Sequence, residues 1–430
     1  MKILTYQSDD FWRQLEEHLF IRDEETSSKI EADVKSIIKE IREYGDDKVI
    51  QFAQDFDKIT IKKDEIKLPN LKNFYSLENL NNETVKSFRL AIQNVRKFHQ
   101  KQYPSDYEIS NMDAKLQSIW KPMDSVGLYV PGGNAVYPSS LIMSVIPAQI
   151  AGVKRIVCVT PPSKSFNPYI AFLLDELNIQ EVYQIGGAQA IAALTYGTET
   201  INPVNKIFGP GNAYVAAAKK QVFGKVGIDL VAGPSEIIVV ADEDNNPEWV
   251  ASDIMAQAEH DENAQSILIT NNNSFAKKVL NNIDNLKKTL SKKETVETSL
   301  KKNGLIVIMD DLKLSYKIIN KIAPEHLHLQ SKEKDFIFQN VNNAGAIFLG
   351  DYSTEAFGDY VAGTNHILPT SGAAKFSSGL GVIDFMKKSS VVEINKLSYE
   401  NLSKHVENIS DVENLDAHKL SVTVRQTKQN

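Results

Sequence analysis

The chain has 430 residues, of which 42% are hydrophobic and 24% charged, a composition typical of soluble globular domains. This length predicts roughly two to four domains. The formal net charge of −7, with no basic stripe, argues against nucleic acid and against an acidic membrane surface as partners.

The first 125 residues contain mostly helical patterns. Residues 1–25 lack the apolar core of a signal peptide, and we expect them to form a separate N-terminal piece. Apolar residues recur at helical spacing over 30–41, and Gly45 is a predicted stop for that helix. Two more helical patterns cover 49–56 and 84–100.

From about 125 to 240, short apolar runs alternate with helical segments. The predicted strands are 126–130, 155–159, 182–185 and 206–208, and the predicted helices are 141–151, 168–177, 188–195 and 212–222. This alternation predicts a parallel sheet with right-handed crossovers. Cys158, the only cysteine, lies in one of these strands, which predicts a core residue and excludes an internal disulfide.

The most apolar stretch of the chain, 141–160, cannot cross a bilayer. It is interrupted by Pro147, Gln149, Lys154 and Arg155. We therefore expect no membrane partner.

A second alternation follows, with predicted strands at 236–241, 265–270, 305–308 and 346–349. From about 385 onward the chain is polar, and its pattern predicts helices. The expected fold class is α/β: two Rossmann-like α/β domains with parallel-rich sheets, plus small helical N- and C-terminal pieces.

Three glycine-bearing turns follow predicted strands of the first alternation, at 129–133, 186–189 and 209–212. Ligands bind at such edges of open parallel sheets, and the helix N-termini there favour phosphates. None of the turns is a complete dinucleotide fingerprint, because Gly209-Pro210-Gly211 lacks the third glycine. Each alone would be an ordinary tight turn; three on one sheet edge indicate a nucleotide or phosphate ligand.

The strongest catalytic candidate is Ala323-Pro324-Glu325-His326-Leu327, which places a carboxylate next to an imidazole. Adjacent side chains on an extended segment diverge, so two proton-transfer groups could act on two parts of one substrate. Further polar clusters occur at 257–260, 358–366 and 413–418.

These clusters could together supply a zinc site. A neutral glutamine and a single carboxylate would leave the ion with a net positive charge, which suits a substrate-binding Lewis acid. The residues alone do not choose among the candidate ligands His260, His326, His328, His366 and His418.

Seven motifs, in order along nearly the whole chain, resemble the histidinol dehydrogenase family. They are GLYVPGG at 127–133, GPGN at 209–212, AGPSE at 232–236, QAEH at 257–260, PEHL at 324–327, GTNH at 363–366 and LDAH at 415–418. The resemblance implies a zinc-dependent, NAD-linked cytoplasmic enzyme of histidine biosynthesis. It would oxidise L-histidinol through L-histidinal to L-histidine with two NAD.

The resemblance also implies a role for each matching residue. The expected zinc ligands are Gln257, His260, Asp359 and His418. Glu325 and His326 are the expected proton-transfer pair. The expected substrate contacts are Ser235, Gln257, His260, His326, Asp359, His366, Glu413 and His418, and the expected NAD contacts are Tyr129, Gln189 and Asn212.

The family forms homodimers with shared active sites, which implies a division of this chain. We expect a discontinuous domain over 26–125 and 237–383 that carries the metal and catalytic residues. The NAD-binding domain would cover 126–236, and a helical piece over 384–430 would reach the partner subunit.

Two other functions fit part of the pattern. A zinc hydrolase with Glu325 as the base leaves the glycine turns unused. A non-catalytic nucleotide-binding protein leaves Glu325 and His326 unused. Formation of NADH from histidinol separates the dehydrogenase from both.

Overall fold

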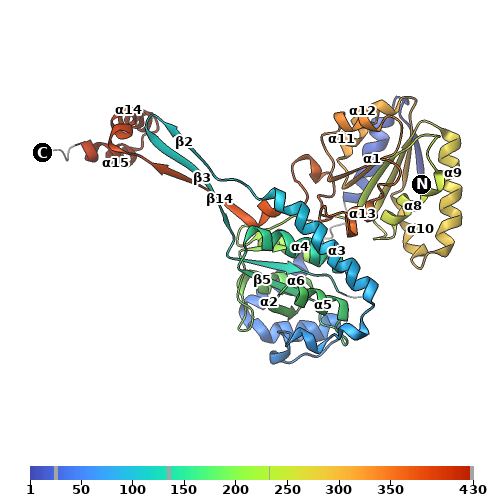
Figure 1. Ribbon diagram of the computed structural model, residues 1–430, viewed down its shortest axis with the longest axis horizontal. Helices are drawn as coiled ribbons and strands as arrows, with labels where there is room; N and C mark the ends of the chain where they lie inside the picture. Colours follow the sequence, from blue (N-terminus) through green and yellow to red (C-terminus); the bar gives the residue numbers. More distant parts are fainter. Residues whose placement is uncertain (24–27, 133–136, 232, 427–430) are drawn as a thin grey trace.

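The computed structural model describes residues 1–23, 28–132, 137–231 and 233–426. Figure 1 shows two α/β lobes and a long arm that projects from one of them and carries the C-terminus. The predicted α/β class is confirmed. Two residues of the predicted motifs, Gly133 and Ala232, lie outside the described residues. Within the described part of the chain, no helix has both the length and the apolar composition needed to cross a membrane.

The first lobe is built on a five-stranded parallel sheet. Its strands, in spatial order, are β6 (Glu181–Gln184), β5 (Arg155–Thr160), β4 (Ser125–Tyr129), β7 (Lys206–Phe208) and β8 (Gly227–Ile228). Chain order reverses beside β4, because β5 and β6 lie on one side of it and β7 and β8 on the other. The space between the carboxyl ends of β4 and β7 is therefore a topological switch point, the usual ligand position in such sheets.

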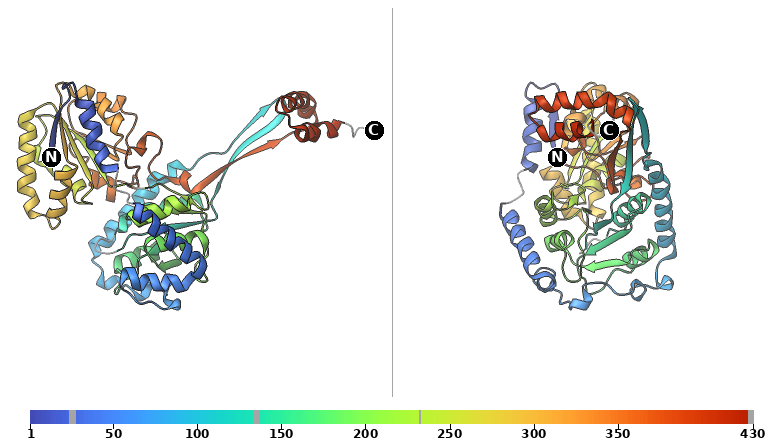
Figure 2. Two further views of the ribbon diagram at one scale, coloured as in Figure 1. Left: turned by 180° about the vertical axis from the view of Figure 1, so that it is seen from behind. Right: turned by 90° about the vertical axis from the view of Figure 1, so that its left-hand side faces the viewer.

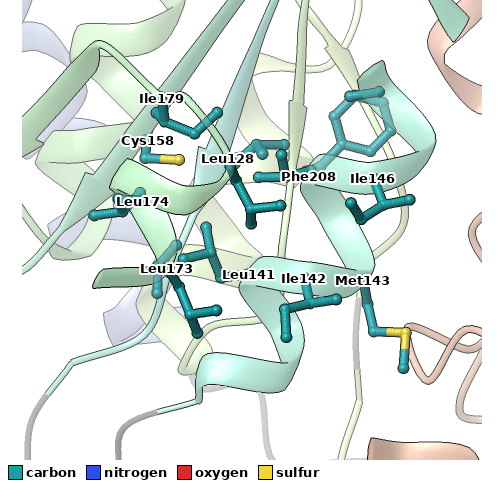
Figure 3. Close-up of a cluster of buried hydrophobic side chains, with 14 of the residues drawn as sticks. Leu128, Leu141, Ile142, Met143, Ile146, Cys158, Leu173, Leu174, Ile179 and Phe208 are labelled. Atoms are coloured by element: carbon teal, nitrogen blue, oxygen red, sulfur yellow. The ribbon is translucent and has the colours of Figure 1, made fainter. Parts of the chain in front are cut away.

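Helices cover both faces of this sheet. They are α2 (Ser28–Phe52), α3 (Asn82–His99), α4 (Pro138–Ala151), α5 (Pro168–Glu176), α6 (Gly187–Tyr196) and α7 (Ala213–Val222). One face packs against α3, α4 and α5, and the other against α2, α6 and α7. Figure 3 shows the first of these cores, where Leu128, Cys158 and Phe208 from three neighbouring strands meet Leu141 and Leu173. Full burial of a large apolar side chain contributes about 1.5–3 kcal/mol, so this core holds the strands in place.

The second lobe contains a six-stranded parallel sheet. Its strands, in spatial order, are β1 (Lys2–Thr5), β11 (Leu305–Ile308), β10 (Gln265–Thr270), β9 (Glu236–Val240), β12 (His326–Leu329) and β13 (Ala346–Leu349). The covering helices are α1 (Phe11–Asp23), α8 (Pro247–Ala258), α9 (Asn273–Leu286), α10 (Lys293–Lys302), α11 (Ser315–Ile322) and α12 (Lys334–Asn340), and a short helix, α13 (Glu355–Tyr360), follows β13. The switch point of this sheet lies between β9 and β12.

The arm is an antiparallel ribbon that ends in a helical pair. The ribbon consists of β2 (Tyr107–Asn111), β3 (Ala114–Pro122) and β14 (Met386–Glu393), and the pair consists of α14 (Lys396–Val412) and α15 (Asp416–Gln426). Figure 2 shows that the helical pair stands well away from both lobes. Large apolar side chains on this arm are exposed, including Ile409 at 61% and Val412 at 83%.

Gly45 interrupts α2 as predicted: its φ of 52 and ψ of −127 are not helical, and they separate two helical segments at a kink. Two expectations from the sequence need correction. Residues 384–430 are not entirely helical, because β14 pairs along its length with β3. A strand of such polar sequence depends on its partner's backbone, which a sequence pattern does not reveal.

The other correction concerns domain membership. The expected domain joins residues 26–125 to 237–383, but α2 and α3 pack on the five-stranded sheet. The apolar stripe of α2, which includes Val34 and Ile41, is buried among residues of α6 and α7. The N-terminal piece is not separate either, since β1 is an edge strand of the six-stranded sheet. Which sheet an amphipathic helix or edge strand joins is decided by packing and not by its own periodicity.

Candidate active site

The two lobes enclose a cleft of about 2320 Å³. The carboxyl ends of β4, β6 and β7 lie on one side of it, and the amino ends of β9 and β12 on the other. Most of the predicted site residues line this cleft: Tyr129, Gln189, Asn212, Ser235, Gln257, His260, Glu325, His326, Asp359 and His366. Glu413 and His418 do not, because they lie on the arm.

On the five-stranded side, the glycine turns bring backbone close to backbone. Tyr129 ends β4, and its hydroxyl accepts a hydrogen bond from the N–H of Gly187, at 3.1 Å. Gly209 has a φ of +113°, and a Cβ there would lie 2.2 Å from the carbonyl oxygen of Tyr129. Only glycine fits this position, so the three strand ends are packed tightly around the switch point.

Two helices begin at this edge. Asn212 is the N-cap of α7, and its side-chain oxygen accepts from the N–H groups of Tyr214 and Val215. Gln189 lies buried in the first turn of α6. Helix N-termini carry partial positive charge and favour phosphate, so this edge suits the pyrophosphate of a dinucleotide.

On the six-stranded side, Glu325 and His326 lie at the start of β12 and are nearly fully buried. The expected divergence of their side chains is not observed: Nδ1 of His326 lies 3.7 Å from Oε2 of Glu325, and both residues line the cleft. The two groups are therefore a coupled pair, close enough for each to set the charge of the other.

Glu236, the first residue of β9, holds this pair in place. Its N–H donates to Oε2 of Glu325 at 2.9 Å, and its carbonyl oxygen lies 3.1 Å from Nδ1 of His326. The N–H of Glu325 donates in return to Oε2 of Glu236, at 3.3 Å. With Nδ1 directed at a carbonyl oxygen, Nε2 is the reactive nitrogen of His326. This atom has no hydrogen-bond partner among the described residues, and it lies 3.8 Å from Oδ1 of Asp359.

Burial and charge shift the pKa values of the pair in a way that suits proton transfer. Burial raises the pKa of Glu325 to about 7, although the neighbouring His326 opposes the shift. Burial alone would lower the pKa of His326, but Glu325, Asp359 and Glu355 around it raise this pKa to about 10. Near neutral pH the pair therefore holds a carboxyl close to its midpoint beside a protonated imidazole.

Three possible cation ligands lie on the same wall. Gln257 is in the last turn of α8, His260 follows that helix, and Asp359 is near the end of α13. Burial lowers the pKa of His260, so its ring is neutral and keeps a lone pair. Burial alone would raise the pKa of Asp359, but His326 lowers it and keeps the carboxylate ionised.

The amide of Gln257 has one orientation that satisfies its neighbours, with the nitrogen donating to Oε2 of Glu355 at 3.0 Å. The carbonyl oxygen is then the end that can act as a ligand. A neutral amide, a neutral imidazole and one carboxylate fit a zinc ion that keeps net positive charge.

The described residues contain no group of three or more His, Cys, Asp or Glu side chains that could hold a metal ion. The predicted set explains why. Of the four predicted ligands, two are residues of those types in this cleft, His260 and Asp359, because Gln257 is an amide and His418 lies on the arm. With His418 on the arm, the cleft of one chain brings together three of the four predicted ligands.

His366 lies in the cleft wall and braces Asp359. Its Nδ1 is 2.9 Å from the carbonyl oxygen of Asp359, and its Nε2 is 3.1 Å from the hydroxyl of Ser140. Both ring nitrogens are thus engaged with the protein. This geometry fits a role in shaping the pocket better than direct contact with a ligand.

Three acidic residues that line or support the cleft are not among the predicted site residues. Glu236 adjoins Ser235 in the AGPSE motif, so its place beside a predicted substrate contact could have marked it. Glu355 lies four residues before Asp359 on α13, and burial raises its pKa to about 8. Asp57 ends a π-helical turn (Ala53–Asp57) and lines the five-stranded side. No pattern marked it, but burial raises its pKa to about 6, and its Oδ2 has no hydrogen-bond partner among the described residues.

Comparisons with known proteins cover almost the whole chain. A family model described as histidinol dehydrogenase matches residues 21–426. Histidinol dehydrogenase from Brucella suis biovar 1 (strain 1330) is 43% identical over 403 residues, 93% of this chain and 94% of the relative. The protein of the same name from Rhizobium meliloti (strain 1021) is 43% identical over 425 residues, 98% of each chain. The crystal structure of histidinol dehydrogenase from Elizabethkingia anophelis matches with a TM-score of 0.92 and 33% identity, covering 99% of this chain and 98% of that one.

Proposed function

The chain belongs to the histidinol dehydrogenase family of oxidoreductases, and on that premise we propose a zinc-dependent four-electron oxidation in the cleft. L-histidinol would be oxidised through L-histidinal to L-histidine with two NAD, as the last steps of histidine biosynthesis. The observation that carries this proposal is the shared cleft, in which the glycine turns of one sheet face Glu325 and His326 of the other. We place the reaction in the cytoplasm, where the NAD pool that it needs is found.

The five-stranded edge would bind NAD through Tyr129, Gln189 and Asn212. Tyr129 and the neighbouring Gly209 form the floor of the switch point. The N-termini of α6 and α7 would stabilise the pyrophosphate, and hydride transfer requires the nicotinamide to reach the six-stranded side of the cleft.

The opposite wall would bind one zinc per subunit through Gln257, His260 and Asp359, with His418 of the partner subunit as the fourth ligand. When bound, zinc would act as a Lewis acid that takes the imidazole and amine of histidinol and so fixes the orientation of the substrate. Ser235 and His366, together with Glu413 of the partner subunit, would complete the pocket around the substrate.

His326 is the base for alcohol oxidation in this proposal. As the hydride leaves the carbinol carbon, the hydroxyl proton must pass to a base, and Nε2 of His326 has no hydrogen-bond partner among the described residues. A free imidazole is needed, yet the surrounding carboxylates favour the protonated ring. A zinc cation held by the nearby Gln257, His260 and Asp359 would lower the pKa of His326 and so favour the free imidazole.

Glu325 is the base for the second half. The aldehyde must gain a water molecule before a second hydride can leave. The carboxylate of Glu325, with a pKa of about 7, can take the proton of that water near neutral pH. Glu236 holds Oε2 of Glu325 through its N–H, so the carboxylate keeps its orientation through both halves.

The arm supports a homodimer in which the sites are shared. It carries Glu413 and His418, and it exposes apolar residues such as Ile409 and Leu420 that a monomer would leave in water. Docking of the arm on a second copy would bury this surface and could deliver both residues to the partner's incomplete ligand set.

The proposal is tested by counting NADH formed per histidinol consumed in zinc-loaded protein. We expect two, with no free histidinal accumulating. One NADH with release of histidinal would contradict the four-electron reaction. No NADH at all, with turnover of an ester or amide, would favour the zinc hydrolase instead.

A further inference from the structure

The five-stranded lobe contains a buried ion pair beside the proposed NAD edge. Lys219 lies in α7 and Asp229 follows β8. Their side chains form an ion pair and are only 3% exposed each. Removing two charges from water is costly, so such a pair needs further hydrogen bonds to be retained.

These hydrogen bonds converge on one glycine. Oδ2 of Asp229 accepts from the N–H of Gly209 at 2.8 Å, and Nζ of Lys219 donates to the carbonyl oxygen of Gly209 at 3.1 Å. Both backbone polar groups of Gly209 are thus held by the two charged side chains. Oδ1 of Asp229 also accepts from the N–H of Leu230, at 2.7 Å, which fixes the carboxylate itself.

A small displacement of Gly209 would be passed on to the turn that follows it. It sits at the switch point, in a left-handed conformation against the carbonyl of Tyr129. It is followed by Pro210, Gly211 and Asn212, which line the cleft and lead into α7. Lys219 is on that same helix, so the turn and the helix that it begins are tied together.

Building on the proposed NAD site, we propose that Lys219 and Asp229 form a positioning clamp for the dinucleotide-binding turn 209–212. Neither residue lines the cleft, so neither touches the cofactor. As a neutral pair they hold the turn without adding net charge near the pyrophosphate. They act through Gly209 and Asn212, and their loss should weaken NAD binding while histidinol binding stays intact.

The same sheet provides a matched control. Arg155 and Glu181 form an ion pair at the starts of β5 and β6, at the amino end of the sheet and away from the cleft. Arg155 also donates to the carbonyl oxygens of Asn202 and Pro203. If both ion pairs only stabilised the fold, replacing either pair should have the same effect on the affinity for NAD.

The test variant is Lys219→Met with Asp229→Leu, because apolar residues of similar volume can replace a buried ion pair without loss of stability. The control is Arg155→Met with Glu181→Leu. Affinity for NAD and for histidinol is measured by direct titration of the zinc-loaded dimer, and hydrogen exchange is followed at the amides of 206–212. We expect the test variant to bind NAD about tenfold more weakly, with faster exchange at Gly209. We expect unchanged histidinol affinity there, and unchanged NAD affinity in the control.

Unchanged NAD affinity in the folded test variant would overturn the clamp, as would an equal loss in the control. If the test variant does not fold, Asp229→Asn keeps the shape of the side chain and removes its charge. It should then raise the Kd for NAD about threefold without changing that for histidinol. Absence of NAD binding by the unmodified protein would overturn the proposed function and the clamp together. If the unmodified protein binds NAD normally, unchanged NAD affinity in the test variant contradicts the clamp alone and leaves the proposed function standing.

Discussion

In the five-stranded sheet the carboxyl ends of the strands face the cleft, whereas in the six-stranded sheet the amino ends do. At the carboxyl edge of the six-stranded sheet, polar groups of the protein bond to one another around a small pocket of about 250 Å³. Asp242 there accepts from the N–H groups of Asp244 and Lys332, and the side-chain amide of Asn245 donates to the carbonyl oxygen of Gln330. Its switch point therefore holds a local network in the place where a ligand would usually bind.

The two edges offer different chemistry. A carboxyl edge leads into helix N-termini, whose backbone N–H groups suit phosphates. An amino edge presents side chains on the first residues of strands, where the ladder fixes their backbone. Glu236 and His326 are such residues, and His326 lies opposite Ile237 in the register of β9 and β12. Proton transfer needs that rigidity, because its rate is sensitive to displacements of a few tenths of an ångström between donor and acceptor.

The largest effect should come from the amino edge. His326→Asn removes the proposed base for alcohol oxidation and the charge partner of Glu325. We expect both half-reactions to slow by about 10²–10⁴-fold. Rates are measured with histidinol and, separately, with histidinal. Wild-type rates with either substrate would break the assignment of proton transfer to this edge, and NAD affinity serves as the control that should stay unchanged.

Glu325→Gln should affect one half of the reaction. The amide keeps the shape of the side chain but cannot take a proton from water, so oxidation of histidinal should fall by about 10²-fold or more. Oxidation of histidinol to the aldehyde should fall much less. If the variant oxidises supplied histidinal at the wild-type rate, Glu325 is not the base.

The pH dependence of the second half follows from the raised pKa of Glu325. The base must be ionised, and burial raises its pKa to about 7. Lowering the pH below this value should therefore reduce the rate of histidinal oxidation about tenfold per unit, with a plateau above it. The measurement is single-turnover oxidation of histidinal across this range. A flat profile in the unmodified protein, or one that Glu325→Gln leaves unchanged, would contradict the assignment.

The sharing of sites can be tested with two inactive variants, His418→Asn and His260→Asn. Mixed in equal amounts, unfolded and refolded with zinc, they should give about half mixed dimers, each with one intact site. About a quarter of wild-type activity should then return. Activity that stays at background would mean that each cleft is completed within one chain, and each variant refolded alone provides the baseline.

The smallest effect is expected at Cys158, in the core of the five-stranded sheet. Burial raises the pKa of this thiol, and its side chain packs among the residues shown in Figure 3. Cys158→Ala should keep its turnover and lose on the order of 1 kcal/mol of unfolding free energy. An NADH assay measures the turnover, and thermal unfolding measures the change in stability. Loss of turnover in a folded, zinc-loaded variant would show that the thiol has a function.

The sequence by itself determined the α/β class, most strands of both sheets and many of the residues that line the cleft. Strands such as 206–208 and 305–308 are short apolar runs bounded by polar turns, and that pattern is local. The family motifs are likewise contiguous, so Glu325 next to His326 and Gln257 near His260 can be recognised without knowledge of the three-dimensional structure. A contiguous motif does not show which distant residue each of its side chains contacts.

Only the tertiary structure decided how distant segments combine. It placed α2 and α3 on the five-stranded sheet, paired the polar strand β14 with β3, and turned the amino edge of one sheet toward the carboxyl edge of the other. It also brought Glu236 against Glu325 and His326, and Asp229 against Gly209. These contacts join residues that are far apart along the chain. They depend on shape and burial summed over whole elements, so no local pattern of residue types encodes them.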